Sequence, residues 1–426
     1  MDLTRLSPRT PRGPIDNRPR AGQHGPATDG SPTSRVTMDI AFLHGRIILE
    51  DRILEDGAVV VQQGAIAWIG PTLELRARPE PAVDLGGFYL SPGFIDLHLH
   101  GGGGVDSMVG DPEALKTLCR THEAFGTTAL CLATLSAPID EIHRALTAIQ
   151  QLAVQGTGGA RLLGAYLEGP FINPARCGPH PTEHILEPDL RTLQSFALAA
   201  GGWLRVVSLA PEMPDAEQLI HWVAHEMQLL AAVGHTSATC EQTEAALQSG
   251  CRLITHLFNN MMPFHHRDPN AAGAALASRE ACAELILDPN HLHPAAARIA
   301  LRCLGPDRIV LITDATSVVG APEGTGLLGK RRVIYQDGVA QFEDGHLAGS
   351  ALTMIDAVRA FIAQVGVEPA VAVRCASLVP ARLLGIADRL GSIAVGKHAD
   401  LLVLDPDDMR VLYTYVGGAR VYKSSY

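Results

Sequence analysis

The sequence has few lysines, no paired-cysteine motif and no long apolar run, and each absence narrows what the chain can be. Of its 34 basic residues only four are lysines, Lys116, Lys330, Lys397 and Lys423. Its eight cysteines are scattered and form no C-x-x-C pair, which is typical of reduced thiols in a cytosolic protein. No run of about 18 apolar residues occurs, so we expect no membrane-spanning helix.

Composition and charge favour a large globular enzyme over a nucleic-acid-binding protein. Hydrophobic residues make up 46% of the 426 residues, enough for one large core. The net charge of -11 opposes binding to nucleic acid, although a local basic group would still permit a small anionic substrate. Residues 1–37 are rich in Pro, Arg, Gly, Ser and Thr and have no apolar segment. We expect a disordered extension there and no secretory signal.

Short β-rich runs at both ends of the chain predict one small domain that brackets the rest. Residues 38–90 contain strand patterns broken by Gly and Asp-Gly turn signals, typical of an antiparallel meander. Residues 388–426 have the same texture. We therefore predict a small β-sandwich domain made from both segments, with 91–387 as the catalytic domain.

The middle segment follows a regular strand-then-helix order that predicts a (β/α)8 barrel. Short apolar runs alternate with amphipathic helical patterns, for example 215–227 and 240–249. The expected strands are 94–100, 127–133, 162–168, 204–210, 229–235, 252–258, 283–288 and 308–314. Chemistry in such barrels takes place at the carboxyl ends of the strands. Polar residues at those ends are therefore candidate site residues.

Histidines and carboxylates end six of the eight expected strands. They are His98 and His100 on the first strand, Glu168 on the third, His235 on the fifth, His256 on the sixth, Asp288 on the seventh and Asp314 on the eighth. His98 and His100 are two residues apart on one strand, so both imidazoles point to the same face. Any one of these residues alone is more simply a structural core residue. As a set, these residues without Asp288 predict a hydrolytic site for a divalent metal, with Zn²⁺ as the first candidate and Fe²⁺, Co²⁺ or Mn²⁺ as alternatives.

Eight segments between residues 38 and 426 carry a resemblance to one known family, in order along the chain. They are PGFIDLHLHGGGGVD, LEGPFINPARCGPH, GHTSAT, THLFNNM, HRDPN, ITDAT, LAGSALTM and GKHADLLVL. This set resembles the N-acetylglucosamine-6-phosphate deacetylases of the amidohydrolase superfamily, which are metal-bearing barrels with a small β-sandwich. Many superfamily members bridge two metals with a carboxylated lysine on strand four. No lysine lies between Lys116 and Lys330 here, and Glu168 is the available substitute.

The resemblance implies a role for each residue of the metal site. Glu168, His235 and His256 are implied as the principal metal ligands, and Asp314 as the catalytic acid and base. His98 and His100 stand where some family members hold a second metal. Whether the chain binds one divalent metal or two stays open at this point.

The resemblance also implies a phosphosugar site in a homodimer. The implied substrate-binding residues are Pro179, His180, Asn259, Asn260, Arg267, His291, Leu347, Ala348 and Gly349. Arg267 is the expected phosphate partner, because a guanidinium offers two donors to phosphate. In the family this arginine reaches the neighbouring subunit's site. From the residues alone, Arg267 could instead pair with Asp268 on a solvated loop.

The expected reaction is the hydrolysis of N-acetylglucosamine 6-phosphate to glucosamine 6-phosphate and acetate, in a cytoplasmic enzyme of amino-sugar catabolism or wall recycling. N-acetylgalactosamine 6-phosphate is the first alternative, because Asn260 and the segment 266–270 depart from the family pattern beside the sugar. Another amidohydrolase reaction on an N-acyl small molecule is the second. A non-catalytic barrel is the third, and the complete ligand set with Asp314 opposes it.

Overall fold

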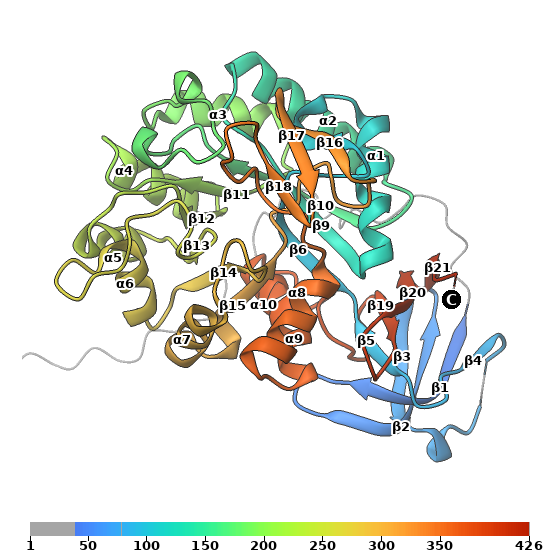
Figure 1. The fold of residues 1–426 in the computed structure, drawn as a ribbon. Coiled ribbons are helices and arrows are strands. Elements are labelled where there is room, and N and C mark those ends of the chain that lie inside the picture. Colours follow the sequence, from blue (N-terminus) through green and yellow to red (C-terminus); the bar gives the residue numbers. More distant parts are fainter. Residues whose placement is uncertain (1–38, 78, 426) are drawn as a thin grey trace, which may run out of the picture.

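The structure, a computed structural model, describes residues 39–77 and 79–425. This part of the chain is organised around two large β-sheets (Figure 1). One is a parallel barrel, and the other is a sheet in which strands from both ends of the chain lie side by side. The expected disordered extension, residues 1–37, lies outside the described residues.

Eight parallel strands form the barrel and confirm the predicted fold class. They are β6 (Phe94–Leu99), β9 (Thr127–Ala133), β10 (Arg161–Glu168), β11 (Leu204–Leu209), β12 (Leu230–Val233), β13 (Leu253–Ile254), β14 (Cys282–Ile286) and β15 (Ile309–Ile312). Their order in the sheet is β15-β14-β13-β12-β11-β10-β9-β6, which is the reverse of the chain order. The last strand returns to the first, since the Asp314 N–H donates to the His98 carbonyl oxygen at 2.9 Å.

Three of these strands, β12, β13 and β15, are at least three residues shorter than the sequence predicts, and each ends just before a polar residue of interest. His235, His256 and Asp314 have φ angles of 48°, 29° and 51°, in the left-handed region that side chains other than glycine rarely adopt. The chain therefore leaves the strand at each of these positions. Such backbone outliers are concentrated at functional sites, where the surrounding structure holds them in place.

Helices cover the outside of the barrel (Figure 1). They are α1 (Pro112–Thr121), α2 (Ile139–Gln155), α3 (Leu190–Ala199), α4 (Ala216–His221), α5 (Cys240–Gln248), α6 (Asn270–Ala277), α7 (Pro294–Leu304), α8 (Met354–Ala360), α9 (Pro369–Ala376) and α10 (Leu378–Leu383). A capping box of Thr239 and Gln242 starts α5. The predicted helix 215–227 is α4 followed by a π-helical turn over Trp222–Glu226. Among the described helices, none is long and apolar enough to cross a membrane.

The second sheet combines strands from the two ends of the described chain. Its strands are β1 (Ile40–Ile48), β2 (Ile53–Gln62), β3 (Ala65–Pro71), β4 (Ala82–Asp84), β5 (Tyr89–Pro92), β19 (Leu401–Leu404), β20 (Val411–Val416) and β21 (Ala419–Lys423). The expected antiparallel meander holds for β1 to β3 only. Strands β4 and β5 both pair parallel to β1, because the chain crosses back over 72–88 instead of turning in a hairpin. The predicted domain boundary between residues 90 and 91 falls inside β5.

A small antiparallel sheet, which the sequence patterns did not predict, covers the mouth of the barrel. Its strands are β16 (Gly324–Leu328), β17 (Arg331–Gln336) and β18 (Val339–Gln341), and we call residues 324–348 the flap. The Arg331 guanidinium lies 3.4 Å from the centre of the Phe342 ring and also donates to the Pro179 carbonyl oxygen at 3.4 Å. The flap is therefore attached to the loop that carries Pro179. A two-stranded hairpin, β7 (Gly101–Gly102) and β8 (Val105–Asp106), follows β6.

A buried ion pair joins the barrel to the terminal sheet. Arg161 Nε donates to Asp400 Oδ2 at 2.7 Å, and Arg161 Nη2 donates to Asp400 Oδ1 at 3.1 Å. The side chains of Arg161 and Asp400 are only 2% and 5% exposed. Asp400 Oδ1 also accepts from the Gly417 N–H at 2.7 Å, so the carboxylate ties three chain segments together.

We expect Asp400→Asn to lower the free energy of unfolding by about 3 kcal/mol, because it leaves the Arg161 guanidinium buried beside a neutral amide. Urea denaturation followed by circular dichroism measures the change. Glu55→Gln is the control, since it breaks the exposed pair with Arg46, and its cost should stay below about 1 kcal/mol. Equal effects of the two substitutions would contradict the structural role of the buried pair.

Candidate metal centre

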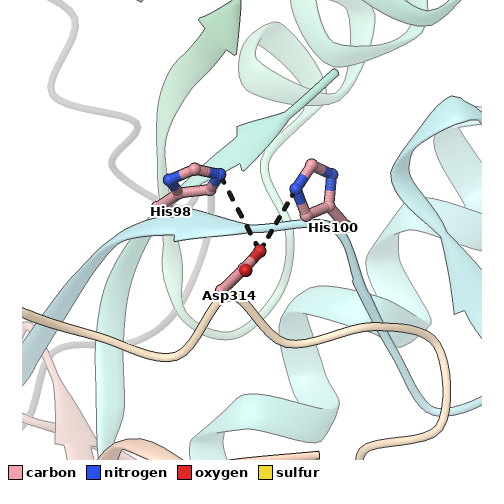
Figure 2. A group of neighbouring side chains, drawn as sticks. All are labelled: His98, His100 and Asp314. Atoms are coloured by element: carbon pink, nitrogen blue, oxygen red, sulfur yellow. Dashed lines mark ion pairs between the residues drawn. The ribbon is translucent and has the colours of Figure 1, made fainter. Parts of the chain in front are cut away.

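Side chains from five strands converge at the carboxyl end of the barrel. They are His98 and His100 from β6, Glu168 from β10, His235 after β12, His256 after β13 and Asp314 after β15. All of these side chains are buried or nearly so. Figure 2 shows His98 and His100 pointing toward Asp314. Most of the set lines a cavity of about 230 Å³, and the structure thus brings together the six residues that were predicted as ligands and acid.

Glu168 lies at the centre of this set. Its Oε1 atom is 3.1 Å from Nε2 of both His235 and His256, and 3.3 Å from His98 Nε2. Its Oε2 atom is 3.1 Å from His100 Nε2. The two oxygens of one carboxylate therefore contact all four of these imidazoles.

The outer nitrogens of two histidines fix which nitrogen faces the centre. His235 Nδ1 lies 2.8 Å from the Arg176 carbonyl oxygen and His256 Nδ1 lies 3.1 Å from the Asn259 carbonyl oxygen. A carbonyl oxygen only accepts, so each Nδ1 carries the proton and each Nε2 presents a lone pair inward.

Converging lone pairs fit a bound cation. The Nε2 atoms of His235 and His256 are 3.1 Å apart and both face Glu168 Oε1 at the same distance. Unprotonated acceptors repel each other at this separation unless a cation lies among them. Two imidazole nitrogens and a carboxylate oxygen are ligands that Zn²⁺ and similar metals prefer. The donor set therefore fits a divalent metal.

The same electrostatics shifts the pKa values of the histidines nearest the carboxylates. Burial alone lowers the pKa of His98, but Glu168 and Glu284 raise it well above its usual range. Burial likewise lowers the pKa of His100, while Asp314 and Glu168 raise it to about 9. In the metal-free protein, protons on these two imidazoles thus supply the positive charge. Metal binding there must displace protons.

His180 presents a hydrogen-bond donor to the same centre. Its Nδ1 atom accepts from the Ser136 N–H at 3.0 Å, so the proton of the neutral ring is on Nε2. Burial lowers the pKa of His180 to about 4, and the ring is therefore neutral at physiological pH. Its Nε2 atom is buried, lies 3.3 Å from Glu168 Oε2 and has no hydrogen-bond partner among the described residues.

Most of the predicted substrate-binding residues surround the cavity. Those that line it are Pro179, Asn259, Asn260, His291, Leu347 and Gly349, and Ala348 is fully buried beside them. His291 Nδ1 lies 2.8 Å from Asp288 Oδ2, which fixes the imidazole. Burial alone lowers the pKa of His291, but this carboxylate raises it above the usual range.

Arg267 is the one predicted substrate residue that neither lines the cavity of its own chain nor is buried beside it. It lies on an exposed loop, where Arg267 Nη1 is 3.0 Å from His266 Nε2. The alternative pairing with Asp268 is not found in the described structure, since Asp268 instead lies 3.6 Å from His265. The assignment of Arg267 to a phosphate stays a prediction.

Several site residues were missed by the sequence reasoning. Glu284 contacts two of the predicted ligands, and Ser136 fixes the ring of His180. His346 and Leu328 come from the flap. A signal existed for Glu284 alone, because a carboxylate inside the apolar run Ala-Glu-Leu-Ile is unusual in a buried strand.

The glycine run after His100 packs closely against its surroundings. A Cβ atom added to Gly101 would lie 2.4 Å from the backbone nitrogen of Ser317, and one added to Gly102 would lie 2.6 Å from His122 Nε2. The same His122 nitrogen donates to the Gly101 carbonyl oxygen at 2.8 Å. Burial lowers the pKa of His122 to about 4, so this imidazole is neutral in the folded protein.

We expect His122 to make the fold sensitive to acid. Its pKa in the folded state, about 4, is below the unfolded value near 6.5, so protons bind the unfolded chain more readily. Stability from this group is complete above about pH 6.5 and is lost as the pH falls toward 4. Between pH 7 and pH 5 the wild type should lose about 2 kcal/mol more than His122→Gln in urea denaturation. Equal losses in the two proteins would contradict this.

Comparisons with known proteins agree with the geometry. Residues 89–421 match the amidohydrolase family. The chain is 38% identical over 360 residues to an N-acetylgalactosamine-6-phosphate deacetylase of Escherichia coli O157:H7, covering 84% of this chain and 93% of that protein. It is 37% identical to an N-acetylglucosamine-6-phosphate deacetylase of Vibrio furnissii, covering 82% and 86% of the two chains. A mutant Mycobacterium smegmatis N-acetyl-D-glucosamine-6-phosphate deacetylase, solved with N-acetyl-D-glucosamine-6-phosphate, superposes with a TM-score of 0.85 at 30% identity, covering 90% of this chain and all of that one.

Proposed function

The chain belongs to the N-acetylglucosamine-6-phosphate deacetylase family of amidohydrolases, and on that premise we propose that it hydrolyses N-acetyl-D-glucosamine 6-phosphate to D-glucosamine 6-phosphate and acetate. One observation carries the proposal. A buried carboxylate, inward-facing imidazole lone pairs, the acid Asp314 and the donor His180 all meet at one cavity. This is the equipment that metal-dependent hydrolysis of an amide requires.

The chain's own residues divide the work of the reaction. Glu168, His235 and His256 would hold a divalent metal, with Zn²⁺ the first candidate, and it would polarise the acetyl carbonyl and lower the pKa of water. Burial alone raises the pKa of Asp314, but His100 and His98 hold it below its usual range, so the group is an ionised base. His180 Nε2 donates to the acetyl oxygen as negative charge develops there.

Asp314 serves both halves of the reaction. Its carboxylate takes a proton from the water that attacks the acetyl carbon, and then delivers the proton to the departing nitrogen. Without this delivery the leaving group would be an amide anion, so the C–N bond would not break at a useful rate. Asp314 Oδ1 lies 3.3 Å from His100 Nε2, which holds the carboxylate at the centre.

The substrate's phosphate defines the remaining part of the proposal. The loop residues Asn259, Asn260 and Leu347 would contact the sugar. Arg267 does not reach its own cavity, which supports a homodimer in which it binds phosphate in the neighbouring subunit's site. We propose that this dimer acts in the cytoplasm.

The galactose epimer is the second candidate substrate. The E. coli relative at 38% identity is named for N-acetylgalactosamine 6-phosphate. The Asn260 side chain lies in the cavity wall beside Gly178, since a Cβ on Gly178 would be 2.6 Å from Asn260 Nδ2. An amide at this place adds hydrogen-bonding groups next to the sugar.

Acetate release from the two epimers, each with and without the 6-phosphate, tests substrate and phosphate together. We expect the 6-phosphates to exceed the free sugars by at least about 100-fold in kcat/KM, because the charge-assisted contact to Arg267 is lost without phosphate. A preference for free sugars would contradict the role of Arg267.

Asp314→Asn should lower kcat by about 100- to 10,000-fold. Full turnover by that variant would contradict the mechanism.

Metal analysis of protein purified without chelators tests how many ions are bound. Because His98 and His100 face Glu168 Oε1 and Oε2, we expect close to two metals per chain in the wild type and close to one in the double variant His98→Gln/His100→Asn. A ratio near one in both proteins would exclude a second tightly held metal at this pair.

A further inference from the structure

Glu284 is a fully buried carboxylate for which the proposed reaction has no use. It lies on β14 between apolar neighbours, and its side chain is 0% exposed. Its Oε2 atom is 3.2 Å from His98 Nδ1 and 3.2 Å from the backbone nitrogen of His256. Its Oε1 atom has no hydrogen-bond partner among the described residues. Since a half-satisfied buried carboxylate destabilises a fold, its presence here points to a function.

His98 is held on two sides, and Glu284 provides one of them. The Tyr166 ring stacks on the His98 ring, with 4.3 Å between ring centres and 27° between ring planes. Tyr166 is fixed in turn, because its hydroxyl is 2.8 Å from Thr255 Oγ1. The stacking sets the plane of the imidazole, and the carboxylate sets which nitrogen faces out.

The orientation of His98 follows from these two contacts. With Nδ1–H donated to Glu284, Nε2 is the nitrogen that faces Glu168 Oε1 at 3.3 Å and Asp314 Oδ1 at 3.9 Å, and it becomes a metal ligand when its proton is displaced. Figure 2 shows this edge of the ring directed at Asp314. The His98 Nε2 atom is buried and makes no hydrogen bond within the described structure, and its near neighbours Glu168 and Asp314 both belong to the centre.

The four candidate ligand histidines around Glu168 differ in what holds their outer nitrogen. Backbone carbonyls hold His235 and His256, and no described group hydrogen-bonds to His100 Nδ1. His98 alone of the four is held by a carboxylate. A carboxylate behind an imidazole fixes its tautomer and makes the inner nitrogen a stronger metal ligand.

We propose that Glu284 is a positioning residue that holds His98 in its Nδ1–H tautomer and thereby sets the affinity of a second divalent metal, held by His98, His100 and Asp314. Those three residues form one of the described groups that could hold a metal ion. The inference rests on the metal-dependent centre of the proposed function. It makes β14, through Glu284, one of the strands that support the metal site.

A double-mutant cycle tests the proposal on metal binding alone. Zn²⁺ is titrated into chelator-treated, dialysed protein, and two dissociation constants are measured for the wild type, Glu284→Gln, His98→Gln and the double variant. We expect Glu284→Gln to weaken the second zinc by about 10- to 100-fold, because a neutral amide supports the imidazole less than a carboxylate does. In the His98→Gln background Glu284→Gln should have no further effect on zinc binding.

The double-mutant cycle also distinguishes the support of His98 from the second contact of Glu284, which is to the backbone nitrogen of His256. If the carboxylate acts only through the backbone nitrogen of His256, Glu284→Gln weakens the first zinc equally in both backgrounds, which would overturn the proposal. Unchanged constants in all four proteins would overturn it as well. Glu123→Gln is the matched control, since it makes the same exchange at a buried carboxylate outside the metal centre, one that accepts from the Ala160 N–H at 3.0 Å, and both zinc constants should stay the same.

A second measurement does not depend on the variants folding. Long-range ¹H–¹⁵N correlation spectra of zinc-saturated wild type labelled at histidine report which ring nitrogen carries the proton. The His98 ring should carry its proton on Nδ1, and a proton on Nε2 would overturn the proposal. Neither experiment uses a sugar, so a chain that releases no acetate from either phosphosugar would refute the proposed function and leave this inference standing.

Discussion

The burial of the Glu168 charge is the constraint on which the rest of the site depends. Burial alone raises the pKa of this carboxylate, yet the surrounding imidazoles, His98 first, hold it well below its usual range. A buried carboxylate needs compensating positive charge. The barrel supplies imidazoles that bind protons in the metal-free protein and bind a metal ion when one is present. Protons and a metal ion therefore compete for the same nitrogen atoms, and this links the metal content of the protein to pH.

The barrel turns this constraint into geometry through its strand ends. The left-handed backbone at His235, His256 and Asp314 places three side chains over the barrel axis at the points where the strands stop. Outer hydrogen bonds then fix the rings: the His235 ring bonds to the Arg176 carbonyl from the loop after β10, and the His256 ring bonds to the Asn259 carbonyl of its own loop. His235 thus depends on an element distant in the sequence, and His256 does so through its backbone nitrogen, which donates to Glu284 Oε2. The site is assembled by tertiary structure, and no single segment contains it.

The sequence predicted the barrel and its polar centre because both follow local rules. Apolar runs of strand length followed by amphipathic helices indicate a (β/α)8 barrel, and its active end is known from topology alone. The sequence did not predict the features that depend on pairing between segments distant in the chain. Strands β4 and β5 run parallel to β1, the flap forms over the mouth, and Glu284 reaches His98 across the sheet. A spacing pattern on β6 shows that two histidines share a face, but it cannot show what lies behind them.

The flap separates the shape of the cavity wall from the support of the metal ligands, two properties that an enzyme must otherwise change together. Its ladder hydrogen bonds run among its own strands β16, β17 and β18, and the barrel ladder does not pass through it. Insertions or substitutions in the flap would reshape one wall of the cavity while the metal ligands keep their supports. The sugar range of this scaffold is therefore free to diverge in evolution, or to be redesigned, at little cost to its hydrolytic chemistry.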